Sequence, residues 1–138
     1  MDTRVIATRL QKLAGYVRHL RDLQHAPLDE YLADENLQAI VERRLQVAIQ
    51  VCMDIASYLI AQLGLQSPDE PQNIFAVLGR EGILSPELAS RMVGMVRFRN
   101  ILVHDYLDID SEIVYTLLAN RISDLEQFAQ EITAKFLS

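Results

Sequence analysis

Apolar residues recur along most of this chain at alternating steps of four and three, and this spacing limits the possible folds more than any other feature. Such a period places apolar side chains along one side of an α-helix, whereas a β-strand requires strict alternation, which nowhere extends beyond a few residues. The first such stripe predicts a helix over residues 3–24. Its members are Ile6, Leu10, Leu13, Val17 and Leu20.

A second and longer stripe predicts a central helix between Asp34, a good N-cap residue, and Gly64, a natural C-terminal stop. Further apolar residues fall off this stripe, so the apolar arc is wide; they are Ile40, Ile49, Val51 and Ile60. Such a helix must be covered by neighbours on several sides, and a second copy of the chain is one candidate. Asp54, on the same helix, is expected to be a structural carboxylate that is buried or lies in an interface.

Turn and capping residues divide the second half of the chain. Residues 66–72 hold two prolines and predict a loop, and a short helix is expected at 74–78, before two glycines. Ser85 and Pro86 then supply an N-cap and a proline at the first helical position. The helix that starts there is expected to fray near residues 104–107.

The final stripe predicts one continuous helix over residues 111–136, with Ile113 and Leu117 on its apolar side. The chain has the usual length of one domain, and it contains neither repeats nor low-complexity tracts. We therefore expect an all-α, antiparallel helical bundle with four main helices plus short ones. The predicted domain covers residues 1–138.

The charge balance bears on partners and location. The formal net charge of −6 argues against a general nucleic-acid coat protein but leaves room for a local basic cleft. Charged residues interrupt the candidate membrane spans, and the start MDTRVIATRLQK lacks the features of a secretory signal. We expect no membrane partner and a cytoplasmic location.

Metal-ligating residue types are sparse. Cys52 is the only cysteine, so neither an internal disulfide nor a zinc–thiolate cluster is expected, and its apolar helical surroundings predict a buried core residue. His19, His25 and His104 are scattered, without metal-site spacing. We predict no intrinsic metal and no cofactor.

One segment, RFRNILVHDY, combines several reactive side chains. On a regular helix Arg97, Asn100 and His104 lie on one stripe, since they are spaced by three and four residues. Arg99 and Tyr106 would point away from His104. These residues can act together only if the helix ends near the histidine or if two subunits contribute.

The composition of this segment suits phosphodiester chemistry. An imidazole moves protons near neutral pH, a guanidinium holds phosphate oxygens, and the amide of Asn100 can orient either group. Without a carboxylate pair for Mg²⁺, the reaction open to such a site is metal-free cleavage of RNA through its 2′-hydroxyl. A structural alternative is that His104 merely caps its own helix.

The motif RNILVHDY resembles the signature of HepT-like toxins of the HEPN superfamily. The likeness extends to VERRLQVAIQVCMDIASYLI, similar to the long central helix of that family, and to IFAVLGREGILSPELASRMVGMVRFRNILVHDY. The resemblance implies a helical bundle that dimerises and acts as the toxin of a toxin–antitoxin pair. It also implies RNA as substrate, no metal, a catalytic cleft lined by both subunits, and an MntA-like nucleotidyltransferase as the antitoxin.

Specific roles follow from the resemblance, residue by residue. Arg99 and His104 match the catalytic arginine and histidine, Asn100 matches their common polar partner, and Tyr106 matches the tyrosine to which the antitoxin attaches AMP. Arg97 stands where many relatives have a small residue. Which arginine faces phosphate stays open, since the helical stripe favours Arg97 and the family register favours Arg99.

A function of another class fits the same residues. The domain would then be a catalytically idle subunit that binds nucleotides or docks a nucleotidyltransferase, with the motif serving only as an interface. Cleavage of RNA by the purified protein distinguishes this alternative from a nuclease.

Overall fold

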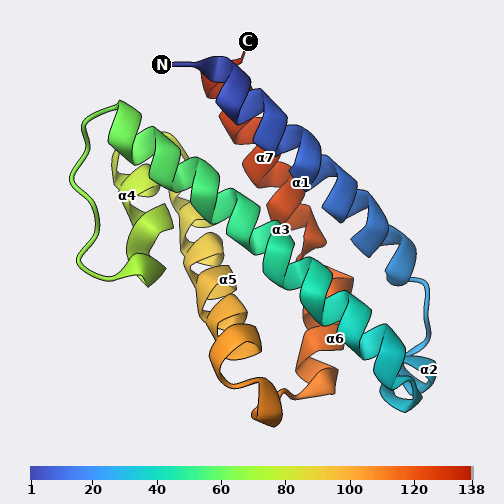
Figure 1. Cartoon of the computed structure of the whole chain (residues 1–138). Coiled ribbons are helices and arrows are strands. Elements are labelled where there is room, and N and C mark those ends of the chain that lie inside the picture. Colours follow the sequence, from blue (N-terminus) through green and yellow to red (C-terminus); the bar gives the residue numbers. More distant parts are fainter. Residues whose placement is uncertain (138) are drawn as a thin grey trace.

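The chain folds into a bundle of α-helices, seen in a computed structural model that describes residues 1–137 (Figure 1). Within this range the helices are α1 (Thr3–Leu23), α2 (Leu28–Ala33), α3 (Glu35–Gln62), α4 (Ile74–Arg80), α5 (Pro86–His104), α6 (Ser111–Asn120) and α7 (Ile122–Phe136). Two short 3-10 helices, η1 (Pro71–Asn73) and η2 (Tyr106–Asp108), precede α4 and follow α5. The predicted all-α fold is confirmed.

Helix α3 forms the centre of the bundle. It contacts α1, α5 and α7, as well as the shorter helices α2, α4 and α6. Successive long helices run in opposite directions, so the chain returns along α7 and the two ends lie side by side (Figure 1). The buried side chains of these helices form one hydrophobic core. The expected domain of residues 1–138 includes Ser138, which lies outside the described residues.

The ends and the core of α3 follow from its sequence. The Asp34 side chain accepts a hydrogen bond from the backbone N–H of Leu37 at 3.0 Å, and Gly64 adopts a φ of 65° just beyond the helix. Cys52 is fully buried in the core, and this burial raises the pKa of its thiol. The prediction of a buried core cysteine is confirmed. Ile40 remains 44% exposed, so the described chain leaves part of the apolar arc uncovered.

The expectation that charges interrupt every candidate membrane span was too strict. By length and composition alone, α3 is long and apolar enough to cross a membrane. It is also the helix that supplies the centre of the core, where Leu45, Ile49 and Ile55 are fully buried by its neighbours. The central helix of a helical bundle needs this apolar character to be covered on several sides.

The prediction of one final helix was wrong. The chain breaks at Arg121, with φ −116° and ψ 0°, into α6 and α7. Asp124, in the first turn of α7, is buried and accepts a hydrogen bond from Arg91 of α5 at 2.9 Å. Before the break, α6 buries Val114 and leaves Ile113, which was expected on the apolar side, 58% exposed. Tertiary contacts therefore override the continuous apolar stripe that predicted a single helix.

Candidate active site at the end of helix α5

The helix that carries the motif is fixed at its start by α7. Ser85 caps α5, and its N–H and hydroxyl both donate to the carboxylate of Glu131, at 2.7 and 3.1 Å. Burial alone would raise the pKa of Glu131, but the hydrogen bonds from Ser85 and Gln127 and the nearby charge of Arg91 hold it below the usual value. These hydrogen bonds anchor the start of α5 to α7.

The motif lies where α5 ends. His104 is the last residue of the helix, its side chain is exposed, and Asp105 forms the C-cap. Tyr106 begins the short helix η2, and its side chain is 65% exposed. The expected end of the helix near the histidine is confirmed. Both side chains are therefore accessible to another molecule.

Arg99 is the best-positioned cation of the motif. Its side chain is half-buried between α5 and α3, where Nη2 donates to Oε1 of Gln50 at 2.6 Å and Nη1 donates to Oδ1 of Asn100 at 3.1 Å. Gln50 in turn donates through Nε2 to Oδ1 of Asp54 at 2.8 Å. Two acceptors on two helices thus restrict the guanidinium to one orientation, while other N–H groups remain available for a phosphate.

Arg97 points elsewhere. It is exposed and lines an open groove of about 610 Å³ between α4 and α5, together with Arg80. The other lining residues include Gly79, Ser90 and Gly94, whose side chains are small or absent. Nothing in residues 1–137 fixes the Arg97 guanidinium by a hydrogen bond. The two arginines of the motif therefore differ in setting: Arg99 is held in a polar network, and Arg97 is free on a groove.

The structure brings together part of the predicted cluster. Arg99 and Asn100 are in contact, whereas the predicted stripe of Arg97, Asn100 and His104 forms no hydrogen-bonded group in the described chain. Sequence reasoning missed the role of Gln50. Asp54 was expected to be buried or to lie in an interface, but its side chain is exposed in the described chain, where it accepts a hydrogen bond from Gln50.

A signal for this pair existed in the sequence. Gln50 and Asp54 are polar residues four positions apart within an otherwise apolar helix, a spacing that lets their side chains meet. Which residue of α5 lies opposite them depends on how the two helices pack, and the spacing does not contain that information.

Comparison with known proteins identifies the family. Residues 13–132 match the Ribonuclease HepT-like family. The chain belongs to this family. It is 31% identical to the tRNA nuclease HepT of Aphanizomenon flos-aquae over 97% of this chain and 91% of that relative. It is 30% identical to the mRNA nuclease HepT of Shewanella oneidensis, over 91% of this chain and 96% of that one.

Solved structures agree with this assignment to the HepT-like family. One is a toxin–antitoxin complex with AMP-PNP, for which the TM-score is 0.88 at 25% identity, with 95% of this chain and 98% of the other covered. Another is the tri-AMPylated HEPN toxin of Shewanella oneidensis in complex with its MNT antitoxin, with a TM-score of 0.87 at 26% identity and coverage of 97% and 99%. The resemblance to HepT-like toxins and the HEPN-like fold are confirmed.

Proposed function

We propose that this protein is the toxin of a toxin–antitoxin pair. It acts in the cytosol as an endoribonuclease, and it needs no metal ion for cleavage. Its family and the nuclease names of its relatives support the activity, and the complexes of similar toxins with MNT antitoxins support the pairing. The observation that carries the assignment to a site is the oriented guanidinium of Arg99 on the helix that ends at an exposed His104.

The proposed reaction is an attack within the RNA strand. The 2′-hydroxyl oxygen bonds to the adjacent phosphorus, the bond from phosphorus to the 5′-oxygen breaks, and the proton lost by the 2′-hydroxyl is balanced by a proton given to the leaving 5′-oxygen. His104 is the proton-transfer group, because an imidazole both accepts and donates protons near neutral pH. Arg99 binds the phosphate oxygens as negative charge develops on them, and Asn100 helps to orient Arg99.

Two copies of the chain would supply the complete cleft. Arg99 donates to Gln50 of α3 and to Asn100, whereas His104 is exposed at the helix end, and no hydrogen bond joins Arg99 to His104 within residues 1–137. Ile40 of α3 and Ile101 of α5 are each 44% exposed, although both belong to helices that build the core. A symmetric dimer would cover such residues and place a second motif opposite the first. Sedimentation at micromolar concentration should give a dimer, and a monomer would remove the argument for a composite cleft.

Tyr106 is the proposed site of control. The partner nucleotidyltransferase would attach AMP to its exposed hydroxyl, two residues beyond His104. The added phosphate is negative and would pair with the cations that otherwise bind the substrate phosphate. Charge and bulk together would then block the cleft. The tri-AMPylated state of the similar Shewanella oneidensis toxin supports this type of control.

RNA cleavage in the presence of EDTA tests the nuclease directly. The purified protein should cleave RNA after chelation, since the described residues include no group of three or more His, Cys, Asp or Glu side chains placed to hold a metal. His104→Ala should remain folded and lose cleavage by at least about 100-fold, the usual contribution of a proton-transfer group. If folded His104→Ala cleaves as well as the original protein, the idle docking subunit becomes the better explanation.

Lysine substitutions test which arginine binds phosphate. Arg99→Lys should reduce cleavage strongly, because a lysine cannot donate at once to Gln50, Asn100 and a phosphate in the planar geometry of a guanidinium. Arg97→Lys keeps the charge on an open groove and should change cleavage by less than about threefold. The reverse ranking would assign the phosphate to Arg97 and would contradict the role proposed for Arg99.

A further inference from the structure

Positive charge is concentrated on α1, although the chain as a whole is acidic. Between residues 3 and 21 the helix has cations and no carboxylate, and the first acidic residue within it is Asp22. The cations are Arg4, Arg9, Lys12, Arg18 and Arg21. Arg18 and Arg21 border a groove between α1 and α7, where Arg21 pairs with Glu126, whereas the other three cations lie on the flank of α1 that faces α3. In a protein with net charge −6, that flank is locally attractive to anions. The nuclease motif, on α5, does not include any of these residues.

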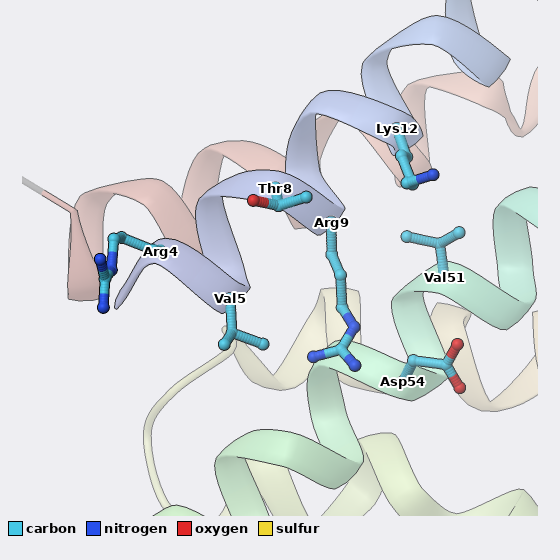
Figure 2. Close-up of a pocket in the computed structure, with 7 residues that line it drawn as sticks. All are labelled: Arg4, Val5, Thr8, Arg9, Lys12, Val51 and Asp54. Atoms are coloured by element: carbon cyan, nitrogen blue, oxygen red, sulfur yellow. The ribbon is translucent and has the colours of Figure 1, made fainter. Parts of the chain in front are cut away.

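Three of these cations line a groove between α1 and α3. The groove has a volume of about 460 Å³ and is bordered by Arg4, Arg9 and Lys12 from α1 and by Val51 and Asp54 from α3. Figure 2 shows Arg9 extending from α1 toward the turn of α3 that carries Asp54, with Lys12 further along the same helix. The groove therefore has a mainly basic wall, with one carboxylate on the opposite side.

Arg9 is held in place and still has a free donor. Its guanidinium carbon lies 5.7 Å from the centre of the Tyr58 ring, a cation–π contact that fixes the side chain. Its Nη1 atom is buried and has no hydrogen-bond partner among the described residues. A buried donor without an acceptor is costly, so this position favours a ligand that supplies an oxygen. Arg4, in contrast, is already paired with Asp2 at 3.1 Å.

The groove is connected to the candidate active site through α3. Asp54 borders the groove and accepts a hydrogen bond from Gln50, the same side chain that accepts from Arg99. Gln50 and Asp54 are one helical turn apart, a rise of about 6 Å along the helix axis. A strand whose phosphate is bound by Arg99 needs to extend only a short distance along α3 to reach Arg9 and Lys12.

We propose that the groove between α1 and α3 binds the backbone phosphates of the RNA strand next to the phosphate that is cleaved, with Arg9 and Lys12 as the contacts. This inference rests on the proposed ribonuclease function and adds a binding site outside the motif. The contacts are to phosphate and therefore contribute affinity without sequence preference. Asp54 opposes binding by its charge and keeps Gln50 oriented.

RNA binding by a cleavage-deficient protein provides the test. His104→Ala protein is titrated into a fluorescent single-stranded RNA of about 20 nucleotides at several salt concentrations, with anisotropy as the readout. Lys12→Gln should weaken binding about threefold, and Arg9→Gln combined with Lys12→Gln about tenfold. The slope of log affinity against log salt should fall by about 0.7 for each phosphate that the variant no longer binds. Arg18→Gln is the matched control. It removes an exposed cation of the same helix that lies outside this groove, so this variant should bind RNA as tightly as the protein without this substitution.

A variant with the opposite expected effect strengthens the test. Asp54→Asn keeps an oxygen to accept from Gln50 and removes the negative charge from the groove, so RNA affinity should increase. Because Arg9→Gln also removes the cation–π interaction with Tyr58, thermal unfolding checks its fold. Lys12→Gln by itself keeps the test decisive if the double variant does not fold.

The outcomes separate this inference from the proposed function. Unchanged affinity and salt slope in folded Lys12→Gln and double variants would overturn the groove, even if the protein with His104 cleaves RNA. Variants that bind RNA normally but lose affinity for the nucleotidyltransferase would assign the groove to that protein and also overturn the inference. If the His104-containing protein never cleaves RNA, the nuclease proposal fails, while the expected pattern of variants would still establish an RNA-binding groove.

Discussion

Replacing Gln50 by methionine tests the network that orients Arg99. Gln50→Met keeps the length and approximate volume of the side chain, but it removes the acceptor for Arg99 Nη2 and the donor to Asp54. A hydrogen bond to a charged group contributes about 1.5–3 kcal/mol. The partly exposed setting and the remaining bond from Arg99 to Asn100 place the loss near the lower limit, at about 1.5 kcal/mol.

This loss should appear as roughly a tenfold decrease in kcat/KM for RNA cleavage, since about 1.4 kcal/mol corresponds to a factor of ten. Single-turnover cleavage of a labelled RNA measures it, with thermal unfolding as the check on folding. Gln62→Met is the matched control: it makes the same change at the exposed far end of α3 and should cleave normally. If folded Gln50→Met cleaves at the original rate, Gln50 does not position Arg99 and the proposed role of the network is wrong.

Three further predictions concern packing, pH and control. Gly79→Ala should destabilise the protein by about 1–3 kcal/mol, because a Cβ there would lie 2.7 Å from the Cβ of Ala89. Gly94→Ala is the control: its Cβ would meet nothing within 4 Å, so it should be neutral or stabilising in the same thermal unfolding measurement. Glu131→Ala should lower the free energy of unfolding by about 1 kcal/mol at pH 7, from hydrogen bonds to a charged group that is partly exposed. Because the pKa of Glu131 is held below 4.5 in the folded protein, its stabilising contribution is present above pH 4.5 and is lost as the pH falls through the native pKa. Urea titrations that show the same loss of stability for Glu131→Ala at pH 7 and at pH 3 would contradict this prediction. Tyr106→Phe should still cleave RNA but resist silencing by ATP and the partner nucleotidyltransferase, and peptide mass spectrometry that maps AMP only to other residues would refute the site.

Local sequence signals were sufficient to predict most of the helices. The apolar stripe of α1 and the caps at Asp34 and Ser85 work within one segment, and the structure has these features at the predicted residues. The helix end near His104 was also predicted from the sequence, as one of two ways in which the residues of the motif could act together, and α5 does end there. Each of these predictions depends on neighbours within a few positions in the chain.

The features that were missed depend on contacts between distant segments. The break at Arg121 accompanies a buried Asp124 that pairs with Arg91, 33 residues away in the chain. Gln50 and Arg99 are 49 residues apart, and their contact exists only because α3 and α5 pack together. A periodic pattern shows which side of a helix is apolar, but it does not show which polar residue of another helix lies opposite.

The chemical form of the cleaved RNA ends tests the central claim most directly. The purified protein is incubated with a defined RNA in EDTA, and the masses of the products are measured. An attack by the 2′-hydroxyl, assisted by His104 and Arg99, predicts a 2′,3′-cyclic phosphate on one product and a 5′-hydroxyl on the other, with no cleavage where the attacking 2′-hydroxyl is replaced by hydrogen. Products with a 3′-hydroxyl and a 5′-phosphate, or cleavage that EDTA abolishes, would contradict the account.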